Sequence, residues 1–478
     1  MRRVGVDTGS THVDVVVVED GEIVEKRKEP HHGDIESGTL RALEGVEGDE
    51  VRVSTTLPIN ELLSRGGDPV HLVLVPGPGL NPRPLLDIAE SYEVLPGYVD
   101  HRGDVVKGVG KSSGAPDGYA VAVCVKYSTR NSEVEREIAP ESVEDVTFSH
   151  HCPHGSFPER VATAVLGAKI RRITREFLDS LPEVDFVVKG DGGVQSREEA
   201  LRVPVNVLHS GPAAGGLGAV FLTGKSNLRL LDVGGATVDV IDVEDGAPVT
   251  VDGAELFGYR TTVRAADVKS VPLGGNVVVG KDGRVIPERV VDTPASLGGS
   301  EPTVTDALVV EGLVDGDYDV RAARRALERL GDPREIASEV VSTLEEGLRP
   351  LVEGSDRPVF WAGTLAPAVR DLVGRGEVVP HHDVCNAVGC AVAGRSREAT
   401  VYINTEEGRG HVVPVGESFE VPKGGTLNDV DAVELASDAA GFDPDEVEVR
   451  VFDVVRGAVR VGSWAVVRLY QKPRVEPV

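Results

Sequence analysis

The sequence predicts an α/β protein made of two related halves around a cleft, followed by a small β-rich tail domain. Residues 7–21 (DTGSTHVDVVVVEDG) and 232–246 (DVGGATVDVIDVEDG) share nine of fifteen positions without a gap. Such a match between distant segments indicates a duplicated domain whose two matched loops face each other across the cleft. From residue 398 onward, alternating valines and turn residues indicate a separate unit of short strands.

Each copy of the repeat is typical of a β-hairpin whose first turn carries a carboxylate. An apolar run breaks at Asp-x-Gly, resumes as a valine-rich strand and ends at an Asp-Gly turn. Glycines in the first turn allow the backbone to approach a polyphosphate, and the N–H groups of such a turn form an anion-binding nest. The candidate phosphate-binding residues are Gly9, Ser10, Thr11, Gly234, Gly235 and Thr237, with Thr8 as a further hydroxyl donor.

Asp7 and Asp232 stand at the strand ends, where carboxylates can hold magnesium or orient an attacking water. Asp14 and Asp239 follow one strand later and either join the site or only anchor the hairpins. For a single copy, a tight turn that needs glycine, with Asp and Thr bonding its backbone, explains these residues equally well. Two matched copies favour the phosphate-binding interpretation.

The remaining elements follow in order along the chain. After a first hairpin at 4–28, apolar runs predict short strands near 51–56, 70–75 and 119–127. Helical periodicity predicts a long helix over 159–180. A strand at 186–188 should lead into a glycine turn, and a loop should lead into a tightly packed helix of small residues at 210–219. One or two amphipathic helices are predicted over 321–351, interrupted at Asp332-Pro333. A last strand at 358–361 should break at Gly363-Thr364.

Composition excludes several classes of partner. The formal net charge of −28 argues against binding nucleic acid or an anionic membrane, because both would be repelled. No apolar stretch is long enough to span a bilayer, and the first strand begins too early to leave room for a signal peptide. Four cysteines in 478 residues make no disulfide framework, so we expect a cytoplasmic protein. A single methionine and many charges suggest a thermophilic, salt-adapted archaeon.

Several strings resemble one superfamily in order. They are Ser54-Thr55-Thr56, SGPAAG at 210–215 and EPTVTDA at 301–307. With the paired loops, they resemble the actin, sugar-kinase and heat-shock ATPase superfamily, and within it the ATP-binding A-type subunit of the hydantoinase/oxoprolinase family. The resemblance implies duplicated ribonuclease-H-like (actin-like ATPase) domains around a nucleotide cleft. The implied domains are 1–180 and 181–397, followed by the tail at 398–478.

The chain departs from the family pattern in places. It is shorter than the usual A-type subunit, and in this respect it resembles the group named methanogenesis marker protein 14, from methane-producing archaea. The glycine-rich G-A-G-G-G-S segment of the family stands here as residues 272–276 (PLGGN). The Gly-Thr pair of the second phosphate loop stands as Ala236-Thr237.

The resemblance implies ATP and Mg²⁺ as cofactors, held between the two loops, with Asp7 and Asp232 as the magnesium-binding and catalytic carboxylates. It also implies adenosine contact at Gly363 and Thr364, and a segment at Ser210 that couples nucleotide state to cleft closure. The implied activity is that of an ATP-dependent hydrolase that activates a cyclic amide or carbonyl oxygen. The expected partners are a small-molecule amide or carbonyl substrate and either a B-type subunit or a second copy of the chain.

Two other function classes stay open. One is a non-catalytic, ATP-dependent switch or assembly factor for another enzyme, which the lack of a B-type region favours. The other is a small-molecule kinase on the same fold. A metal site is a separate question, because histidines and cysteines cluster at 149–154 (SHHCPH) and 381–385 (HHDVC). Their spacing matches no standard zinc motif, so polar loop residues without metal are the favoured alternative.

Overall fold

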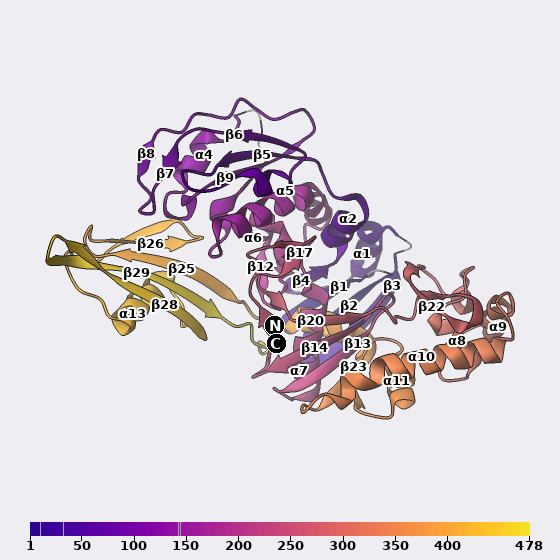
Figure 1. Cartoon of the computed structure of the whole chain (residues 1–478). Coiled ribbons are helices and arrows are strands. Elements are labelled where there is room, and N and C mark those ends of the chain that lie inside the picture. Colours follow the sequence, from indigo (N-terminus) through magenta and orange to yellow (C-terminus); the bar gives the residue numbers. More distant parts are fainter. Residues whose placement is uncertain (10, 32, 142, 144) are drawn as a thin grey trace.

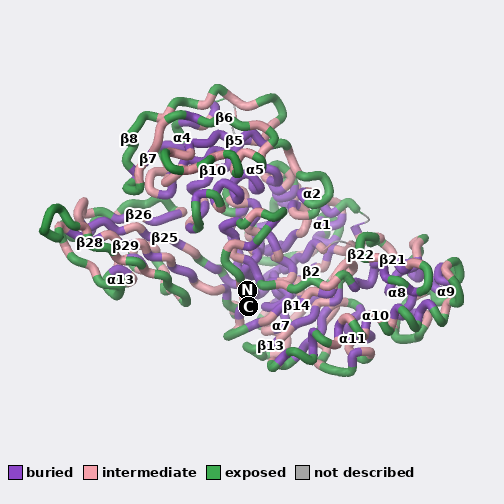
Figure 2. Tube along the Cα trace, viewed as in Figure 1, coloured by how far each residue is buried: buried purple, intermediate pink, exposed green. Residues whose placement is uncertain are grey.

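The computed structural model describes all of residues 1–478 except 10, 32, 142 and 144. Figure 1 shows two sheet-and-helix halves side by side, a lobe above the first half, a helical lobe beside the second, and a long twisted β-sheet that projects away from both. Figure 2 shows that the buried residues follow the strands and helices within each lobe. The cleft between the halves therefore separates bodies that have their own apolar cores.

The first half is built on a six-stranded sheet with the order β12-β11-β4-β1-β2-β3. The predicted first hairpin is present, with β1 (Arg2–Thr8) antiparallel to β2 (His12–Glu19), and Asp7 lies opposite Asp14. Strand β4 (Glu50–Thr55) runs parallel to β1. The other strands are β3 (Glu22–Pro30), β11 (Phe186–Val188) and β12 (Val194–Ser196). Domain limits at 180 and 397 stay a prediction, although this sheet takes its last two strands from beyond residue 180.

The second half repeats this topology. Its sheet has the order β15-β14-β13-β23-β24, with β13 (Leu228–Val233) antiparallel to β14 (Val238–Glu244) and parallel to β23 (Val359–Ala362). Asp232 lies opposite Asp239, as Asp7 lies opposite Asp14. The sheet is completed by β15 (Ala247–Pro248), β20 (Val268–Val271) and β24 (Glu377–Val378). The repeated sequence thus folds into repeated structure, and the predicted duplication is confirmed.

Two helices of small residues pack against each other between the sheets. Helix α7 (Ser210–Thr223) contacts β13 and β14, whereas α12 (Cys385–Val392) lies on β1 and β2. A side chain at Gly5 or Gly389 would collide with the backbone of α12 or α7 respectively. Close packing at this density leaves no room for a Cβ at these two positions, which explains why glycine and alanine are frequent where the two helices meet. The small-residue helix predicted within 210–219 is therefore confirmed, and its packing partner is α12.

Each half carries an insertion. In the first, helix α5 (Phe157–Ser180) covers a four-stranded parallel sheet, and a capping box of Ser156 and Glu159 begins the helix. In the second, α9 (Val320–Glu328) and α10 (Pro333–Glu353) are separated at the predicted break, where the side chain of Asp332 caps α10. The four-stranded sheet consists of β5 (Val70–Val75), β6 (Ser91–Val94), β9 (Ala120–Val125) and β10 (Val146–Phe148).

The tail is a five-stranded antiparallel sheet with the order β27-β26-β25-β29-β28, covered on one face by α13 (Asp429–Ala440). The β-rich character predicted from residue 398 is therefore confirmed. After the sheet the chain returns to the first half, where the side chain of Glu476 lies 2.9 Å from Arg3 and 3.1 Å from Arg52. The strands are β25 (Arg397–Asn404), β26 (Arg409–Val413), β27 (Glu417–Glu420), β28 (Glu446–Arg456) and β29 (Val459–Gln471).

Shorter elements connect these parts. The helices are α1 (Ile35–Leu43), α2 (Leu57–Arg65), α3 (Arg83–Leu86), α4 (Glu133–Ile138), α6 (Arg197–Arg202), α8 (Val304–Val310) and α11 (Ala366–Val373). The strands are β7 (Tyr98–Val99), β8 (Val105–Lys107), β16 (Thr250–Val251), β17 (Glu255–Leu256), β18 (Tyr259–Arg260), β19 (Ala265–Ala266), β21 (Val277–Val279) and β22 (Val285–Val290).

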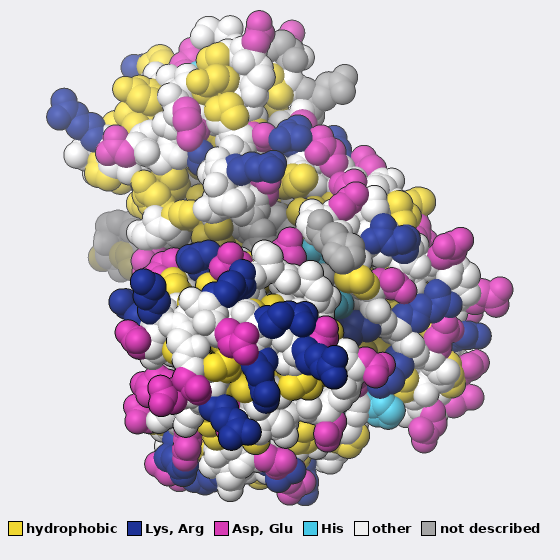
Figure 3. Space-filling view, turned by 90° about the vertical axis from the view of Figure 1, so that its right-hand side faces the viewer, with side chains coloured by type: hydrophobic (Ala, Val, Ile, Leu, Met, Phe, Trp, Pro, Cys, Tyr) yellow, Lys and Arg dark blue, Asp and Glu magenta, His cyan; other side chains and the backbone are white. Residues whose placement is uncertain are grey.

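Among the described residues, no helix has the length and apolar character that crossing a bilayer requires. On the face drawn in Figure 3, Lys and Arg side chains lie among Asp and Glu side chains. This face therefore shows mixed charges and not the continuous basic surface with which proteins contact a nucleic-acid backbone. The mixture agrees with the net charge of −28.

Candidate functional site

A cavity of about 580 Å³ lies between the two halves and is lined by both copies of the repeat. Nine of the ten site residues predicted from the sequence line it, although they come from segments more than 200 residues apart. The tenth, Ser10, lies outside the described residues. The nine are Asp7, Gly9, Thr11, Asp232, Gly234, Gly235, Thr237, Gly363 and Thr364.

The two turns that face the cavity have the same hydrogen bond. The backbone N–H of Gly9 donates to the carbonyl of His12 at 3.0 Å, and that of Gly234 donates to the carbonyl of Thr237 at 2.9 Å. Within the part of the chain that the structure describes, no hydrogen bond engages the backbone N–H of Gly235 or Ala236. These two groups therefore remain available as donors to an anion.

Residues 272–276 (PLGGN), which stand in place of the glycine-rich string, support the second turn. Three consecutive N–H groups donate to carbonyls of the turn: Gly274 to Ala236 at 3.2 Å, Gly275 to Gly234 at 3.0 Å and Asn276 to Gly235 at 2.7 Å. A Cβ on Gly274 would collide with the backbone of Gly235 and Ala236. Glycine is therefore required at 274 because two backbones meet there.

The EPTVTDA string holds this supporting segment in place. Thr305 donates its N–H at 2.9 Å and its hydroxyl at 2.8 Å to the carbonyl of Gly275. The buried carboxylate of Asp306 accepts from the N–H groups of Ala295, Ser296 and Thr303 at 2.7–3.0 Å. The sequence interpretation used this string only as a family signature. Its Thr-x-x-Asp spacing was a readable signal of a helix cap.

Asp7 is buried, Asp232 is partly buried, and both line the cavity. The hydroxyl of Ser54 donates to Asp7, and the side-chain amide of Asn386 donates to Asp232 Oδ2 at 2.9 Å. Burial raises the pKa of Asp7, against the hydrogen bond from Ser54. Burial also raises the pKa of Asp232 to about 7, and the negative charges of Asp239 and Asp7 act in the same direction. A site of this kind favours the binding of a cation.

The next pair of carboxylates is not symmetric. Lys28 Nζ lies 2.8 Å from both carboxylate oxygens of Asp14, and burial still raises the pKa of Asp14 to about 6. Asp239 Oδ1 is buried without a hydrogen-bond partner, and burial raises the pKa of this carboxyl. Both line the cavity. The sequence interpretation missed Lys28, although its position opposite Asp14 on β3 follows from the strand register.

Gly363 directly follows strand β23 and has a φ of 93°, and a Cβ there would collide with the backbone of Val233. Its N–H donates to the carbonyl of His382 at 2.8 Å, and its carbonyl lies 2.8 Å from His382 Nδ1. Close contact with β13 thus explains the glycine without any ligand. Both Gly363 and Thr364 line the cavity. Adenosine contact at these residues stays a prediction.

Ser210 begins helix α7, and its buried hydroxyl has no hydrogen-bond partner. Gly211 and Pro212 line the cavity, and a Cβ on Gly211 would lie 3.6 Å from Asp7 Oδ1. The start of this helix therefore lies beside the carboxylate of Asp7.

The structure does not join the two His/Cys clusters into one ligand set. His150 Nδ1 lies 2.6 Å from buried Glu135, His154 Nε2 lies 2.9 Å from Glu398, and Cys385 Sγ lies 3.5 Å from the carbonyl of Gly215. Among the described residues, the group whose three or more ligand atoms converge is His154 with Asp252 and Glu398.

The sequence matches two family models. Residues 3–88 match the hydantoinase/oxoprolinase N-terminal region, and residues 160–356 match the hydantoinase/oxoprolinase model. The chain belongs to the hydantoinase/oxoprolinase family. The family resemblance of the sequence is therefore confirmed, whereas the narrower resemblance to methanogenesis marker protein 14 stays a prediction.

Curated relatives of this family member are distant and longer. The uncharacterized protein MJ0964 of Methanocaldococcus jannaschii is 23% identical over 386 residues, which cover 65% of this chain and 56% of the relative. The acetophenone carboxylase gamma subunit of Aromatoleum aromaticum is 26% identical over 400 residues, covering 66% and 54% respectively. The chain spans about half the length of the curated relatives that it matches.

Two solved structures share the fold. The nucleotide-free structure of an acetone carboxylase, described in terms of ATP-dependent acetone carboxylation, superposes with a TM-score of 0.69 at 17% identity, covering 99% of this chain and 81% of that chain. The ATP-dependent caprolactamase of Pseudomonas jessenii gives 0.60 at 16% identity, covering 99% and 88%. With the repeated sheet topology, these matches confirm the predicted actin-like fold of the family member.

Proposed function

We propose that the chain binds Mg-ATP in the cleft cavity and uses it to activate an amide or carbonyl oxygen of a small molecule. It would do so as the A-type subunit of a hydantoinase/oxoprolinase-like hydrolase. The observation that carries this proposal is the pair of matched turns at Gly9 and Gly234, each of which follows an aspartate and lines the same cavity. Loops of this kind position a polyphosphate through backbone N–H groups.

The residues present fit magnesium and a polyphosphate. The cavity, about 580 Å³, lies within the usual size range of small-molecule sites. Six aspartates line it (Asp7, Asp14, Asp232, Asp239, Asp292 and Asp383), and the ion pairs of Lys28 with Asp14 and of Lys26 with Asp383 offset only part of their charge. A polyphosphate would be repelled unless a cation came with it, and Mg²⁺ is commonly bound through carboxylates together with phosphate oxygens. The unpartnered atoms Asp239 Oδ1 and Asn386 Oδ1 are further acceptors for metal-bound water.

When bound, ATP would supply the phosphoryl group for the substrate oxygen, with ADP as the leaving group, and magnesium would supply charge neutralisation. Asp7 and Asp232 would hold the metal through its waters. Ser54 and Asn386 fix the orientation of these carboxylates. The N–H groups of Gly235 and Ala236 would donate to phosphate. The protein's part is positioning and charge neutralisation, because phosphoryl transfer needs little covalent help.

Two names among the relatives and fold neighbours support this choice of reaction class. The caprolactamase acts on a cyclic amide and the acetone carboxylase on a ketone, and both are described as ATP-dependent. A B-type partner subunit or a second copy of this chain would complete such an enzyme, and the name of one relative, the gamma subunit of a carboxylase, supports a multi-subunit arrangement. The alternative, a switch or assembly factor, predicts nucleotide binding without substrate-stimulated turnover.

Calorimetric titration with ATP and magnesium tests the proposal. Asp7→Asn and Asp232→Asn should each weaken magnesium-dependent binding by roughly tenfold or more, because each removes a charged ligand. Asp245→Asn is the matched control, since it lies at the far, exposed end of the same hairpin. Binding that is independent of magnesium, or unaffected by both cleft variants, would contradict the site. Binding without ATP turnover on cyclic amides or ketones, with and without partner, would favour the switch.

A further inference from the structure

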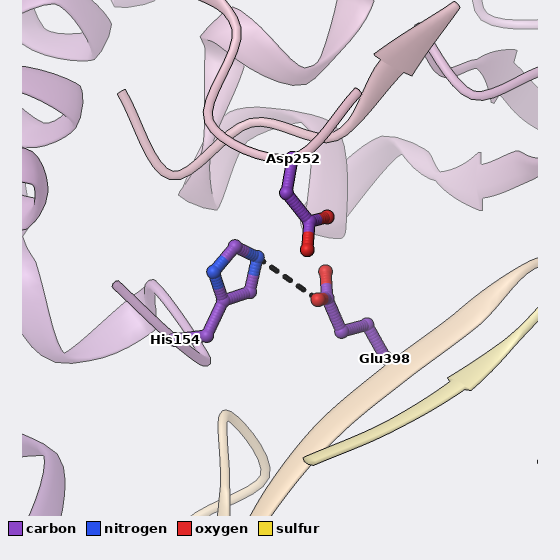
Figure 4. Close-up of side chains that lie close together, drawn as sticks. All are labelled: His154, Asp252 and Glu398. Atoms are coloured by element: carbon purple, nitrogen blue, oxygen red, sulfur yellow. Dashed lines mark ion pairs between the residues drawn. The ribbon is translucent and has the colours of Figure 1, made fainter. Parts of the chain in front are cut away.

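A second cluster of metal-ligating side chains lies outside the cleft, where three separate parts of the chain meet. His154 comes from the loop before α5, Asp252 from the turn after β16, and Glu398 from β25 of the tail sheet. Figure 4 shows the imidazole and the two carboxylates pointing toward one another. None of the three lines the cleft cavity.

The donor atoms converge closely. One ligand atom from each residue lies within 4.8 Å of the other two, and His154 Nε2 is 2.9 Å from Glu398 Oε1. A divalent zinc-like ion holds its ligands at about 2.0–2.2 Å in tetrahedral geometry, which places two ligand atoms about 3.4 Å apart. The cluster therefore needs a contraction of up to about 1.4 Å to surround such an ion.

His154 gives an independent indication that a ligand belongs there. The residue is only 7% exposed, and its Nε2 is buried without a hydrogen-bond partner. Glu398 Oε1 lies 2.9 Å from this nitrogen, but the contact does not have hydrogen-bond geometry. A buried nitrogen that faces two carboxylates without bonding either has the placement of a metal ligand.

We propose that His154, Asp252 and Glu398 bind one divalent first-row transition-metal ion of the zinc class, which fastens the tail domain to both halves. An imidazole with two carboxylates suits such an ion, whereas calcium and magnesium prefer oxygen ligands alone. The three protein ligands leave coordination positions for water. Because the ligands belong to different parts of the fold, the ion stabilises their association in the manner of a structural metal.

Two arginines provide the chief competing explanation. Arg264 lies 2.8 Å from Asp252, and Arg468 lies 3.4 Å from Asp252 and 3.7 Å from Glu398. Each also pairs with a glutamate of β28, Arg264 with Glu446 at 2.8 Å and Arg468 with Glu448 at 3.1 Å. Each guanidinium is therefore divided between a carboxylate of the cluster and a glutamate of β28. Both oxygens of Asp252 contact an arginine, Oδ1 with Arg264 and Oδ2 with Arg468, so a metal bound to Asp252 would share an oxygen with one guanidinium or displace it.

Metal analysis of the full chain tests this site. Protein stripped with chelator, incubated with Zn²⁺ in the absence of nucleotide and desalted should retain about one ion per chain. Co²⁺ in place of Zn²⁺ should give visible d–d absorption, and Mg²⁺ or Ca²⁺ in excess should not displace either ion. Zn²⁺ should also raise the melting temperature of the chain, because binding to the folded state alone stabilises it.

Variants assign the ion to these residues. His154→Ala and Glu398→Gln should lower zinc affinity by roughly tenfold or more, and Glu398→Gln nearly preserves the side-chain shape if His154→Ala fails to fold. His411→Ala is the matched control, because this tail histidine contacts Ser418 and lies outside the cluster. Retention of no zinc by the wild-type chain, or equal retention by all variants, would overturn the proposal and leave the arginines as the sole neutralising partners.

Discussion

The side-chain amide of Asn386 donates a 2.9 Å hydrogen bond to Asp232 Oδ2, and this contact crosses between the two halves. Asn386 belongs to α12, which lies on the first sheet, whereas Asp232 ends a strand of the second. The same amide also opposes the rise in the pKa of Asp7. A single side chain thus stabilises the ionised form of both candidate metal-binding carboxylates.

Replacing Asn386 by alanine should weaken magnesium-dependent ATP binding. A hydrogen bond to a charged group contributes about 1.5–3 kcal/mol, which corresponds to a loss of roughly tenfold or more in affinity. The physical reason is that Asp232 would keep its proton to higher pH and compete less well for the metal. Titration calorimetry at neutral pH measures the change, with exposed Asn227→Ala as control. Unchanged affinity in Asn386→Ala would contradict this role.

ATP affinity in the presence of magnesium should rise with pH through neutrality. Burial places the pKa of Asp232 at about 7 and that of Asp14 at about 6, so both are partly protonated in weakly acidic solution. A metal binds the deprotonated carboxylate, and each unit of pH below the pKa should cost up to about tenfold in affinity. Calorimetry from about pH 5.5 to 8 tests this, and Asp232→Asn should flatten the upper part of the profile.

The same shift has the opposite sign for the stability of the ligand-free protein. The folded-state pKa of Asp232, about 7, exceeds the ordinary value of 3.8, so between these values the folded state binds more protons than the unfolded state. The contribution of Asp232 to stability therefore falls as pH rises through this window and is lowest above pH 7. Asp232→Asn should raise the melting temperature at about pH 8 by roughly 2–4 °C without ligand. A lowered melting temperature would show that the carboxylate is well compensated.

The parts of the site that could be read from the sequence are those that depend on local chemistry. Asp7 and Asp232 and the glycines after them could be predicted because each repeat carries its own signals. Within fifteen residues, each repeat contains both the strand pattern and the turn residues. Asn386 could not be found in this way, because its place beside Asp232 depends on how α12 packs onto the distant first sheet. No local pattern encodes a contact over 154 residues.

Strands β11 and β12, which join the first sheet beside β4, also show that long-range contacts could not be predicted from the sequence. The sequence predicted a strand at 186–188, and the structure has it, but its pairing with β4 joins residues more than 130 apart. The histidine and cysteine clusters at 149–154 and 381–385, for which polar loop residues without metal were the favoured interpretation, illustrate the same limit. His154 turned out to face Asp252 and Glu398, which carry no histidine or cysteine signal in their own segments.

Lys28 should stabilise the first half through Asp14. Its Nζ lies 2.8 Å from both carboxylate oxygens, and Asp14 is mostly buried. Lys28→Met should therefore lower the free energy of unfolding at neutral pH by about 1–3 kcal/mol, because it leaves the carboxylate without its partner. Asp14→Asn in the Lys28→Met background should cost less than Asp14→Asn alone. A double-mutant cycle by chemical denaturation measures the coupling, and additive effects would contradict it.

The contact between Gly274 and the second turn should control nucleotide binding more than folding. The Gly274 N–H donates to the carbonyl of Ala236 at 3.2 Å, and a Cβ at 274 would collide with the backbone on either side of that carbonyl. Gly274→Ala must therefore displace the turn whose N–H groups are the candidate phosphate donors, while the strands before and after it are held by their own sheet bonds.

We expect Gly274→Ala to reduce ATP affinity by roughly tenfold or more, because a misplacement of about 1 Å in a positioning loop has effects of this size or larger on binding and catalysis. Gly108→Ala is the matched control, since Gly108 has no atom within 4 Å of a new Cβ and an ordinary φ. Calorimetry gives the affinity, and circular dichroism with thermal melting reports whether the fold is kept. Wild-type affinity in Gly274→Ala would mean that the second turn tolerates displacement, and its proposed role in holding phosphate would then have to be abandoned.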